Sequence, residues 1–265
     1  MISLCLMVRF KNERHIMYEF IHHYLEEGVD HFLLLDDNSN DDYLEFNKEW
    51  LQPLIDNGVV VIKGVTLPQK QEYNLHIDYL KSYDWAMVVD MDEFMYSVKT
   101  DTTLKSLITN KYSSYDRIFV IWRVFTHKCK EQPISVIEDN IITHSSNKDI
   151  KTCDGKKNIF KTGHVSSIHV HDIKFSTKET ILGLNSCHNS IIRNNHYRTQ
   201  SDEYLYNVKK YRGGGVDKKK YKSYSSHKHS YFDRECNSLY EKRKGLIEKL
   251  HNREQVKPKS MEPLK

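Results

Sequence analysis

Four short apolar runs near the amino terminus constrain the fold more than any other feature of the sequence. They occupy residues 2–8, 32–35, 59–62 and 86–89. Between them, apolar residues recur about every four positions, as Ile16, Phe20 and Tyr24 do, and Gly28 and Gly58 close the first two patterns. Continuous apolar runs indicate strands covered on both faces, and intervening helices indicate right-handed parallel crossovers. The sequence therefore predicts an α/β fold in which four parallel strands alternate with three helices.

Polar clusters follow three of these predicted strands. They are Arg9 to Glu13, Asp36 to Ser39 and Asp90 to Glu93. In open parallel sheets, ligands bind at the carboxyl ends of the strands, where these clusters are expected to meet. The edge carries neither G-x-G-x-x-G nor G-x-x-x-x-G-K-[ST], which argues against the usual dinucleotide and P-loop sites. A nucleotide bound here is therefore predicted to have its phosphates held through a metal ion.

The acidic cluster after the fourth strand is the strongest indication of chemistry. Asp90, Asp92 and Glu93 follow a buried run directly, and the first two lie two residues apart, so their side chains can face the same side. Carboxylates held this close repel each other unless a positive charge intervenes. Oxygen ligands suit Mg²⁺ or Mn²⁺. The cluster predicts a metal-diphosphate site; the alternative is an acidic turn that follows a core strand.

Several segments follow one another in a distinctive order and spacing. They are Lys11-Asn12-Glu13, Gly28 to Phe32 leading to Asp37-Asn38-Ser39, Asp84 to Phe94, and Asn195 to Ser201 followed by Glu203-Tyr204, Lys209 and Arg212-Gly213. Together they resemble the GT-A-fold glycosyltransferases of the family 2-like and family 92-like group. The resemblance implies a GT-A (Rossmann-like) fold: a mixed, mostly parallel sheet flanked by helices, with a carboxyl-terminal helical extension. The chain departs from the pattern at Gln200, where the group usually has Lys, and after Trp122, where a glycine-containing turn is missing.

The resemblance also implies the reaction and its donor site. Such enzymes transfer a sugar, typically a hexose, from a nucleotide diphosphate to a hydroxyl, here with inversion. Asp92, with Asp90 directly or through water, is expected to hold Mn²⁺ or Mg²⁺ against the donor's phosphates. The residues expected around the base and ribose are Arg9, Asn12, Glu13, Asp36 and Asp37. For Asp36 and Asp37 the alternative role is helix capping. Lys209 and Arg212, beside the flexible Gly213 to Gly215, are candidates for the diphosphate or for a solvated basic loop.

Histidines supply candidates for a third metal ligand. His196 is the first, and its imidazole would favour Mn²⁺ over Mg²⁺. His169 and His171 compete for this role, because residues 165–172 are predicted to form a strand with both imidazoles on one face.

The acceptor side is less well defined by sequence. An inverting transfer needs a base for the acceptor hydroxyl, and Asp172, Glu138 and His171 are the candidates. Trp122, at the end of an apolar strand, is predicted either to stack on an acceptor sugar or to lie in the core. The acceptor itself is a glycan, a protein or a lipid-linked molecule.

The domain organisation follows from composition. Residues 1–215 are predicted to form the glycosyltransferase domain, with a nucleotide-binding half at 1–95 and an acceptor half at 96–215. Residues 216–265 are predicted to form a basic linker, a charged helix from about 233 to 252 and a tail. The net charge is +4, and its basic excess lies late in the chain, which is compatible with peripheral contact with an anionic membrane. The helix is equally compatible with capping the domain or pairing with another subunit.

Cysteine usage and hydropathy indicate the compartment. The five cysteines form no C-x-x-C pair, which favours free thiols in a reducing compartment. No stretch approaches the roughly 20 apolar residues of a membrane span, and Met1 leads directly into the first core strand. We expect a cytoplasmic enzyme of bacterial or viral type.

Two other classes of protein share parts of this pattern. A metal-dependent hydrolase would use similar carboxylates and histidines, but it would leave the polar cluster at Asp36 to Ser39 without a role. A nucleic-acid-binding module would use the late lysines, but they lack the regular aromatic interleaving of a stacking platform. The sequence therefore predicts no specific nucleic-acid partner.

Overall fold

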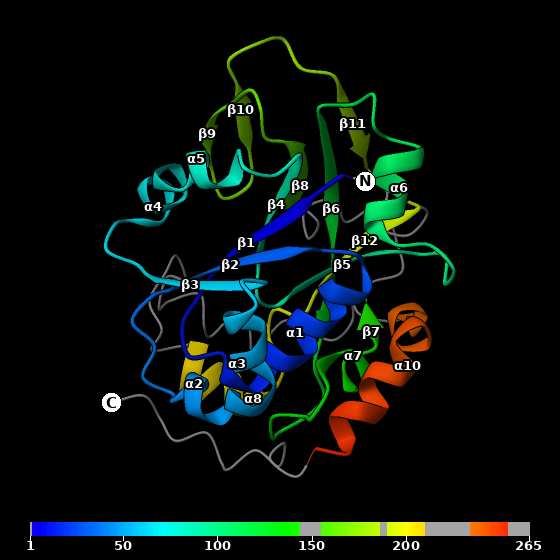
Figure 1. The fold of residues 1–265 in the computed structure, drawn as a ribbon. Coiled ribbons are helices and arrows are strands. Elements are labelled where there is room, and N and C mark those ends of the chain that lie inside the picture. Colours follow the sequence, from blue (N-terminus) through cyan, green and yellow to red (C-terminus); the bar gives the residue numbers. More distant parts are fainter. Residues whose placement is uncertain (1, 144–154, 186–189, 210–233, 254–265) are drawn as a thin grey trace.

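The computed structural model describes residues 2–143, 155–185, 190–209 and 234–253 (Figure 1). Its central sheet begins with four parallel strands that lie side by side in the order β4, β1, β2, β3. They are β1 (Leu4–Phe10), β2 (His31–Asp36), β3 (Val60–Gly64) and β4 (Trp85–Asp90). The predicted number, positions and parallel direction of these strands are confirmed.

Helices connect these strands as predicted, but two of them are divided. The connecting helices are α1 (Arg14–Glu26), α2 (Tyr43–Phe46), α3 (Lys48–Asp56), α4 (Gln69–Leu75) and α5 (Ile77–Leu80). Asn47 separates α2 from α3, and its amide donates to the Tyr43 carbonyl at 3.0 Å and accepts from Trp50 Nε1 at 2.9 Å. Such side-chain bonds compete with regular helical pairing, which periodicity of apolar residues does not reveal.

The second half of the sheet is mixed. Strand β8 (Lys156–Lys161) lies antiparallel between β4 and the long β6 (Arg117–Thr126). The other strands that join this half are β5 (Glu93–Ser97), β7 (Ile142–Thr143), β11 (Ile181–Leu184), β12 (Ile192–His196) and β13 (Arg234–Glu235). Strand β12 pairs with β5 in the antiparallel direction and with β6 in the parallel direction. This pairing brings the late part of the chain to the turn that follows β4.

The remaining described elements are short apart from α10. They are α6 (Leu104–Asn110), α7 (Val136–Asp139), the hairpin strands β9 (Val165–Ile168) and β10 (Ile173–Phe175), α8 (Asp202–Tyr204), the π-helix η2 (Leu205–Lys209) and α10 (Ser238–His251). No described helix is long and apolar enough to cross a bilayer.

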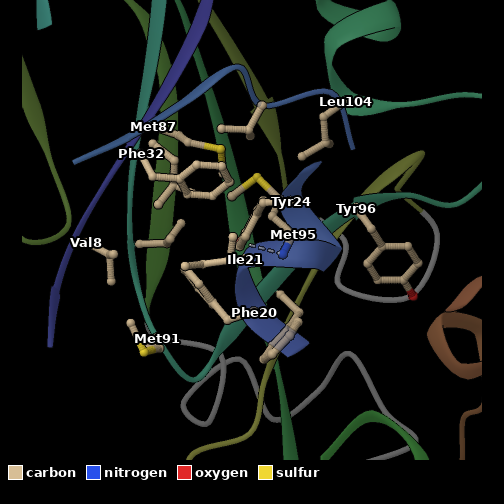
Figure 2. Close-up of a cluster of buried hydrophobic side chains, with 14 of the residues drawn as sticks. Val8, Phe20, Ile21, Tyr24, Phe32, Met87, Met91, Met95, Tyr96 and Leu104 are labelled. Atoms are coloured by element: carbon tan, nitrogen blue, oxygen red, sulfur yellow. Dashed lines mark hydrogen bonds between the residues drawn. The ribbon is translucent and has the colours of Figure 1, made fainter. Parts of the chain in front are cut away.

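Both faces of the parallel strands are buried. Leu4, Leu6 and Val8 of β1 belong to one core cluster with α1 and α10, whereas Cys5 and Met7 belong to a second cluster with α4, α5 and the β9–β10 hairpin. Figure 2 shows part of the first cluster, where the side chains of α1 lie against those of β1, β2, β4 and β5. Burying each large apolar side chain contributes about 1.5–3 kcal/mol. The sheet is therefore a rigid support for its carboxyl edge.

The predicted strand at residues 165–172 is wrong at its end. Strand β9 stops at Ile168, and the His169 N–H donates to the Asp172 carbonyl at 2.8 Å, which closes a turn into β10. His169 and His171 therefore do not share the face of a strand. Alternating polar and apolar residues occur in tight turns as well, so alternation over four residues did not distinguish a strand from a turn.

The carboxyl-terminal helix caps the domain. The predicted helix is confirmed as α10, and its buried side chains are Leu239, Arg243, Leu246, Ile247 and Leu250. Arg243 donates to Glu27 and to His23 Nδ1 on the α1 side, and Lys242 donates to the Ser97 and Thr102 carbonyls. Lys242 and Arg243, which belong to the basic excess late in the chain, thus point into the protein. The predicted loop at 217–231, and Gly213 to Gly215, lie outside the described residues.

Candidate active site

A tight turn gathers three carboxylates at the carboxyl end of β4. Asp90 ends β4, Glu93 begins β5, and the Asp90 N–H donates to Glu93 Oε2 at 3.2 Å. Asp92 is only 5% exposed and Glu93 is fully buried. Three acids in such a space require compensating positive charge.

Lys157 of β8 supplies part of that charge, and sequence reasoning missed it. Its ammonium is fully buried and lies 2.9 Å from Asp90 Oδ2, 3.7 Å from Glu93 Oε2 and 3.3 Å from the Val170 carbonyl. The sequence offered one cue to a buried lysine, since Lys157 lies two residues before the apolar pair Ile159-Phe160. The sequence does not reveal which strands pair with this segment.

The pKa values of Asp90, Glu93 and Lys157 are shifted in different ways. Burial is the largest single influence on the pKa of Asp90 and raises it, but the charge and hydrogen bond of Lys157, together with His196, lower it by more, so the pKa of Asp90 lies below its usual value. Burial raises the pKa of Glu93 well above its usual value, and the neighbouring charges of Asp90 and Asp92 add to this shift. Burial alone would lower the pKa of Lys157, but Asp90 and Glu93 raise it. Asp90 and Lys157 therefore stabilise each other's charged forms.

Asp92 contacts two other predicted site residues, the metal-ligand candidate His196 and the diphosphate candidate Lys209. His196 Nε2 lies 3.3 Å from Asp92 Oδ1, and Lys209 Nζ lies 3.0 Å from Asp92 Oδ2. Strand β12 places His196 directly opposite Glu93, and the Tyr197 N–H donates to the Asp92 carbonyl at 2.8 Å. Burial lowers the pKa of His196 despite the attraction of Asp92, which favours a neutral imidazole that can bind a metal.

The donor atoms fit a divalent ion. Adjacent ligands of an octahedral ion, each about 2.1 Å from it, lie roughly 3 Å apart, close to the 3.3 Å between Asp92 Oδ1 and His196 Nε2. Carboxylate oxygen together with imidazole nitrogen suits Mn²⁺. The described residues contain no group of three His, Cys, Asp or Glu side chains already converged on one point. The protein thus presents a partial donor set, as expected where a substrate's phosphates complete the shell.

The predicted nucleotide-contacting residues divide into two groups. Arg9 Nη2 and Asp37 Oδ2 form an ion pair of 2.9 Å with both side chains partly exposed, so they lie at the edge where a ligand can reach them. Asp36 instead accepts from the Ser39 N–H at 2.8 Å and from the Tyr43 hydroxyl at 3.2 Å, so it stabilises its own loop, whereas the N-cap position of α2 is occupied by Asp42.

The other two predicted residues organise the edge from within. Asn12 has φ +53°, and it joins the β1 and β2 loops because it donates to Ser39 Oγ and accepts from the Asn40 N–H. Glu13 is fully buried and accepts from the Tyr204 hydroxyl at 3.0 Å. Arg212, predicted at the diphosphate, lies outside the described residues.

Trp122 lies beside the metal-binding candidates. Its ring centroid is 4.5 Å from that of His196 and 5.2 Å from that of His171. The ring also lies close over Gly155, where any added Cβ would come within 2.0 Å of it. Strand β6 continues to Thr126, so the chain runs straight on where the family's glycine turn is missing.

The candidate bases are not equally placed. His171 lies in the turn between β9 and β10 against Trp122, and next to it Asp172 forms an ion pair with Arg117. Burial lowers the pKa of His171, and the charge of Lys157 adds to this effect. Glu138 lies on α7, where it contacts His251 of α10 at 2.6 Å. The structure thus brings His171, and not Glu138, to the neighbours of the acid cluster.

Comparison with known protein families identifies the class of protein that this fold and site represent. The family model for glycosyltransferase family 92 matches residues 1–245, nearly the whole chain and most of α10. The protein is therefore a glycosyltransferase. It belongs to glycosyltransferase family 92. No curated protein sequence matches the chain.

Several solved structures are distantly similar to the chain. S. aureus TarS 1–349 in complex with UDP has a TM-score of 0.40 and 13% identity, over 60% of this chain and 47% of that chain. Another structure of TarS 1–349 has a TM-score of 0.42 and 11% identity, and the match covers 86% of this chain and 73% of that chain. The mannosyltransferase PcManGT from Pyrobaculum calidifontis, in complex with GDP-Man and Mn²⁺, has a TM-score of 0.36 and 12% identity, over 46% and 36%. The chain spans less than half the length of the first and the last of these, and such TM-scores locate no individual site residue.

Proposed function

We propose that this protein transfers a sugar from a nucleotide-diphosphate donor to an acceptor hydroxyl, with inversion and with the help of a divalent ion at Asp92, His196 and Asp90. The observation that carries the proposal is the meeting of Asp92 with His196 and Lys209 at the carboxyl end of β4. The acceptor is proposed to be a glycan, a protein or a lipid-linked molecule.

The residues of the site take distinct roles in this proposal. When bound, the metal ion supplies positive charge to the departing nucleoside diphosphate. Lys209 adds a second positive charge on the same side, because its ammonium already lies against Asp92. Arg9 and Asp37 flank the nucleotide at the neighbouring strand ends.

Asp92 offers the most direct test. Asp92→Asn keeps the shape of the side chain but removes the charged ligand, so transfer should fall by at least about 100-fold. The measurement is sugar transfer or donor hydrolysis across a panel of nucleotide sugars with Mn²⁺. Asp78→Asn, which alters an exposed carboxylate on α5, is the matched control and should leave activity unchanged. Near-normal activity of Asp92→Asn in purified protein contradicts the assigned site.

We also propose that His171 is the base for the acceptor hydroxyl and that Trp122 supports the acceptor sugar. The contact between His171 and Trp122, next to His196, supports this choice over Asp172, which is bound to Arg117. His171→Gln should lower kcat by about 100-fold or more while donor affinity stays unchanged. Steady-state kinetics and nucleotide titration check this, and an unchanged kcat excludes His171.

A further inference from the structure

Two lysines reach the acid cluster from different elements and are held in different ways. Lys157 lies within β8, and its side chain is fully buried. Lys209 is the last residue of η2, and its side chain keeps about 15% of its surface exposed. The two cations therefore differ in how easily they can leave the site.

Lys157 is fixed. Its ammonium is shared among Asp90, Glu93 and the Val170 carbonyl, and these partners come from three separate elements. Withdrawal of Lys157 would leave buried carboxylate charge without compensation, which is strongly unfavourable. Metal binding does not require these contacts to break, since none of them uses Asp92 and Lys157 bonds to Asp90 through Oδ2.

Lys209 forms an ion pair with the Asp92 carboxylate, which is also the proposed metal ligand. Its Nζ lies 3.0 Å from Asp92 Oδ2, and it also donates to the Arg198 carbonyl. An ammonium and a divalent ion repel each other strongly at such separations. The lysine stem is long and flexible, and π-helical turns such as η2 are rare conformations that are frequent at functional sites. Lys209 can therefore move while its backbone stays in place.

We propose that Lys157 and Lys209 divide the neutralisation of this site: Lys157 is the permanent counter-ion of Asp90 and Glu93, whereas Lys209 is an exchangeable counter-ion of Asp92. The ion pair between Lys209 and Asp92 breaks when a divalent ion binds Asp92, and Lys209 then pairs with the donor's diphosphate. Lys209 is thus a positioning residue that couples metal entry to nucleotide binding. This inference rests on the proposed function, because it assumes that Asp92 binds the metal.

Direct titration of Mn²⁺ into the full chain without nucleotide tests the exchange. Electron paramagnetic resonance of free Mn²⁺ gives the affinity. Lys209→Met should tighten Mn²⁺ binding roughly tenfold or more, because a competing cation is lost. The same variant should bind UDP or GDP roughly tenfold more weakly at saturating Mn²⁺. Lys209→Arg should restore nucleotide binding, and Lys70→Met, which removes an exposed lysine of α4, should change neither affinity.

Tighter Mn²⁺ binding together with weaker nucleotide binding distinguishes the proposed exchange from structural damage, because damage would weaken the affinities for both Mn²⁺ and nucleotide. If wild-type protein binds Mn²⁺ in an Asp92-dependent way and Lys209→Met does not tighten it, the exchange is wrong while the proposed function stands. If neither protein binds Mn²⁺, even with UDP or GDP present, the metal part of the proposed function fails and the exchange fails with it.

Chemical labelling of lysines provides a second readout. Mass spectrometry after acetylation should show Lys209 reacting several-fold faster once Mn²⁺ is bound and slower again when UDP or GDP is added. Lys157 should stay unmodified throughout, because it is fully buried. Labelling of Lys209 that ignores Mn²⁺, or labelling of Lys157 in folded protein, would overturn the division between the two lysines.

Discussion

Asp90 and Asp92 are two residues apart in the sequence, yet they meet different cations. Asp90 pairs with Lys157 from β8, and Asp92 pairs with Lys209 from η2 and faces His196 from β12. The D-x-D pattern therefore locates these carboxylates in the sequence, whereas the partner of each carboxylate depends on segments that join much later in the chain.

At the residue scale, the buried ion pair of Lys157 should dominate local stability. Lys157→Met leaves Asp90 and Glu93 without their cation, so the free energy of unfolding should fall by about 3–5 kcal/mol. Urea denaturation measures this change. Lys161→Met is the matched control on the same strand, because its ion pair with Asp116 is partly exposed and should contribute less than about 1 kcal/mol. Equal effects of the two substitutions would mean that Lys157 is not the compensating charge.

At the scale of elements, α10 is attached to the domain by a buried polar network in addition to its apolar stripe. The Glu27 carboxylate accepts from Arg243, from Lys242 and from the backbone N–H groups of Ser97 and Leu104. His23 joins this network, because its Nδ1 accepts from Arg243 Nε at 3.0 Å and its Nε2 lies 2.9 Å from the Met95 carbonyl. The helix therefore secures α1 and β5, and β5 begins at the turn that carries Asp92 and Glu93.

Arg243→Met tests this attachment. The substitution keeps an apolar stem but leaves the Glu27 carboxylate short of its main cation, so stability should fall by about 3–5 kcal/mol. Amide hydrogen exchange in α1 and α10 should increase together, since the two helices share the network. Lys244→Met, on the exposed side of α10, should change neither measurement. Unchanged exchange in α1 of Arg243→Met would mean that α10 does not support it.

At the scale of the whole molecule, the site joins both halves of the chain. The β1 and β2 loops and the β4–β5 turn come from the first 97 residues, whereas Lys157, His196 and Lys209 come from the last 110. A donor bound at this edge would touch segments on both sides, so binding should stabilise the entire fold and not one segment alone.

A thermal shift measurement checks this expectation. Mn²⁺ together with UDP or GDP should raise the Tm, because a ligand at 100 times its Kd adds about 2.7 kcal/mol to stability. Asp92→Asn should lose the shift. A metal-dependent hydrolase that ignores nucleotides would show the same Tm with Mn²⁺ alone and with Mn²⁺ plus nucleotide, and this result would contradict the proposed donor.

The sequence by itself determined the parallel half of the sheet, the acidic segment after β4 and the presence of a helix near the position of α10. These features depend on interactions between near neighbours, which the spacing of apolar and charged residues records. It did not determine that Lys157 pairs with Asp90, that residues 169–172 turn, or that Asp36 accepts a hydrogen bond within its own loop. Those outcomes depend on which strands lie side by side, as β8 does with β4 and β12 with β5, and only tertiary packing decides such pairings between distant segments.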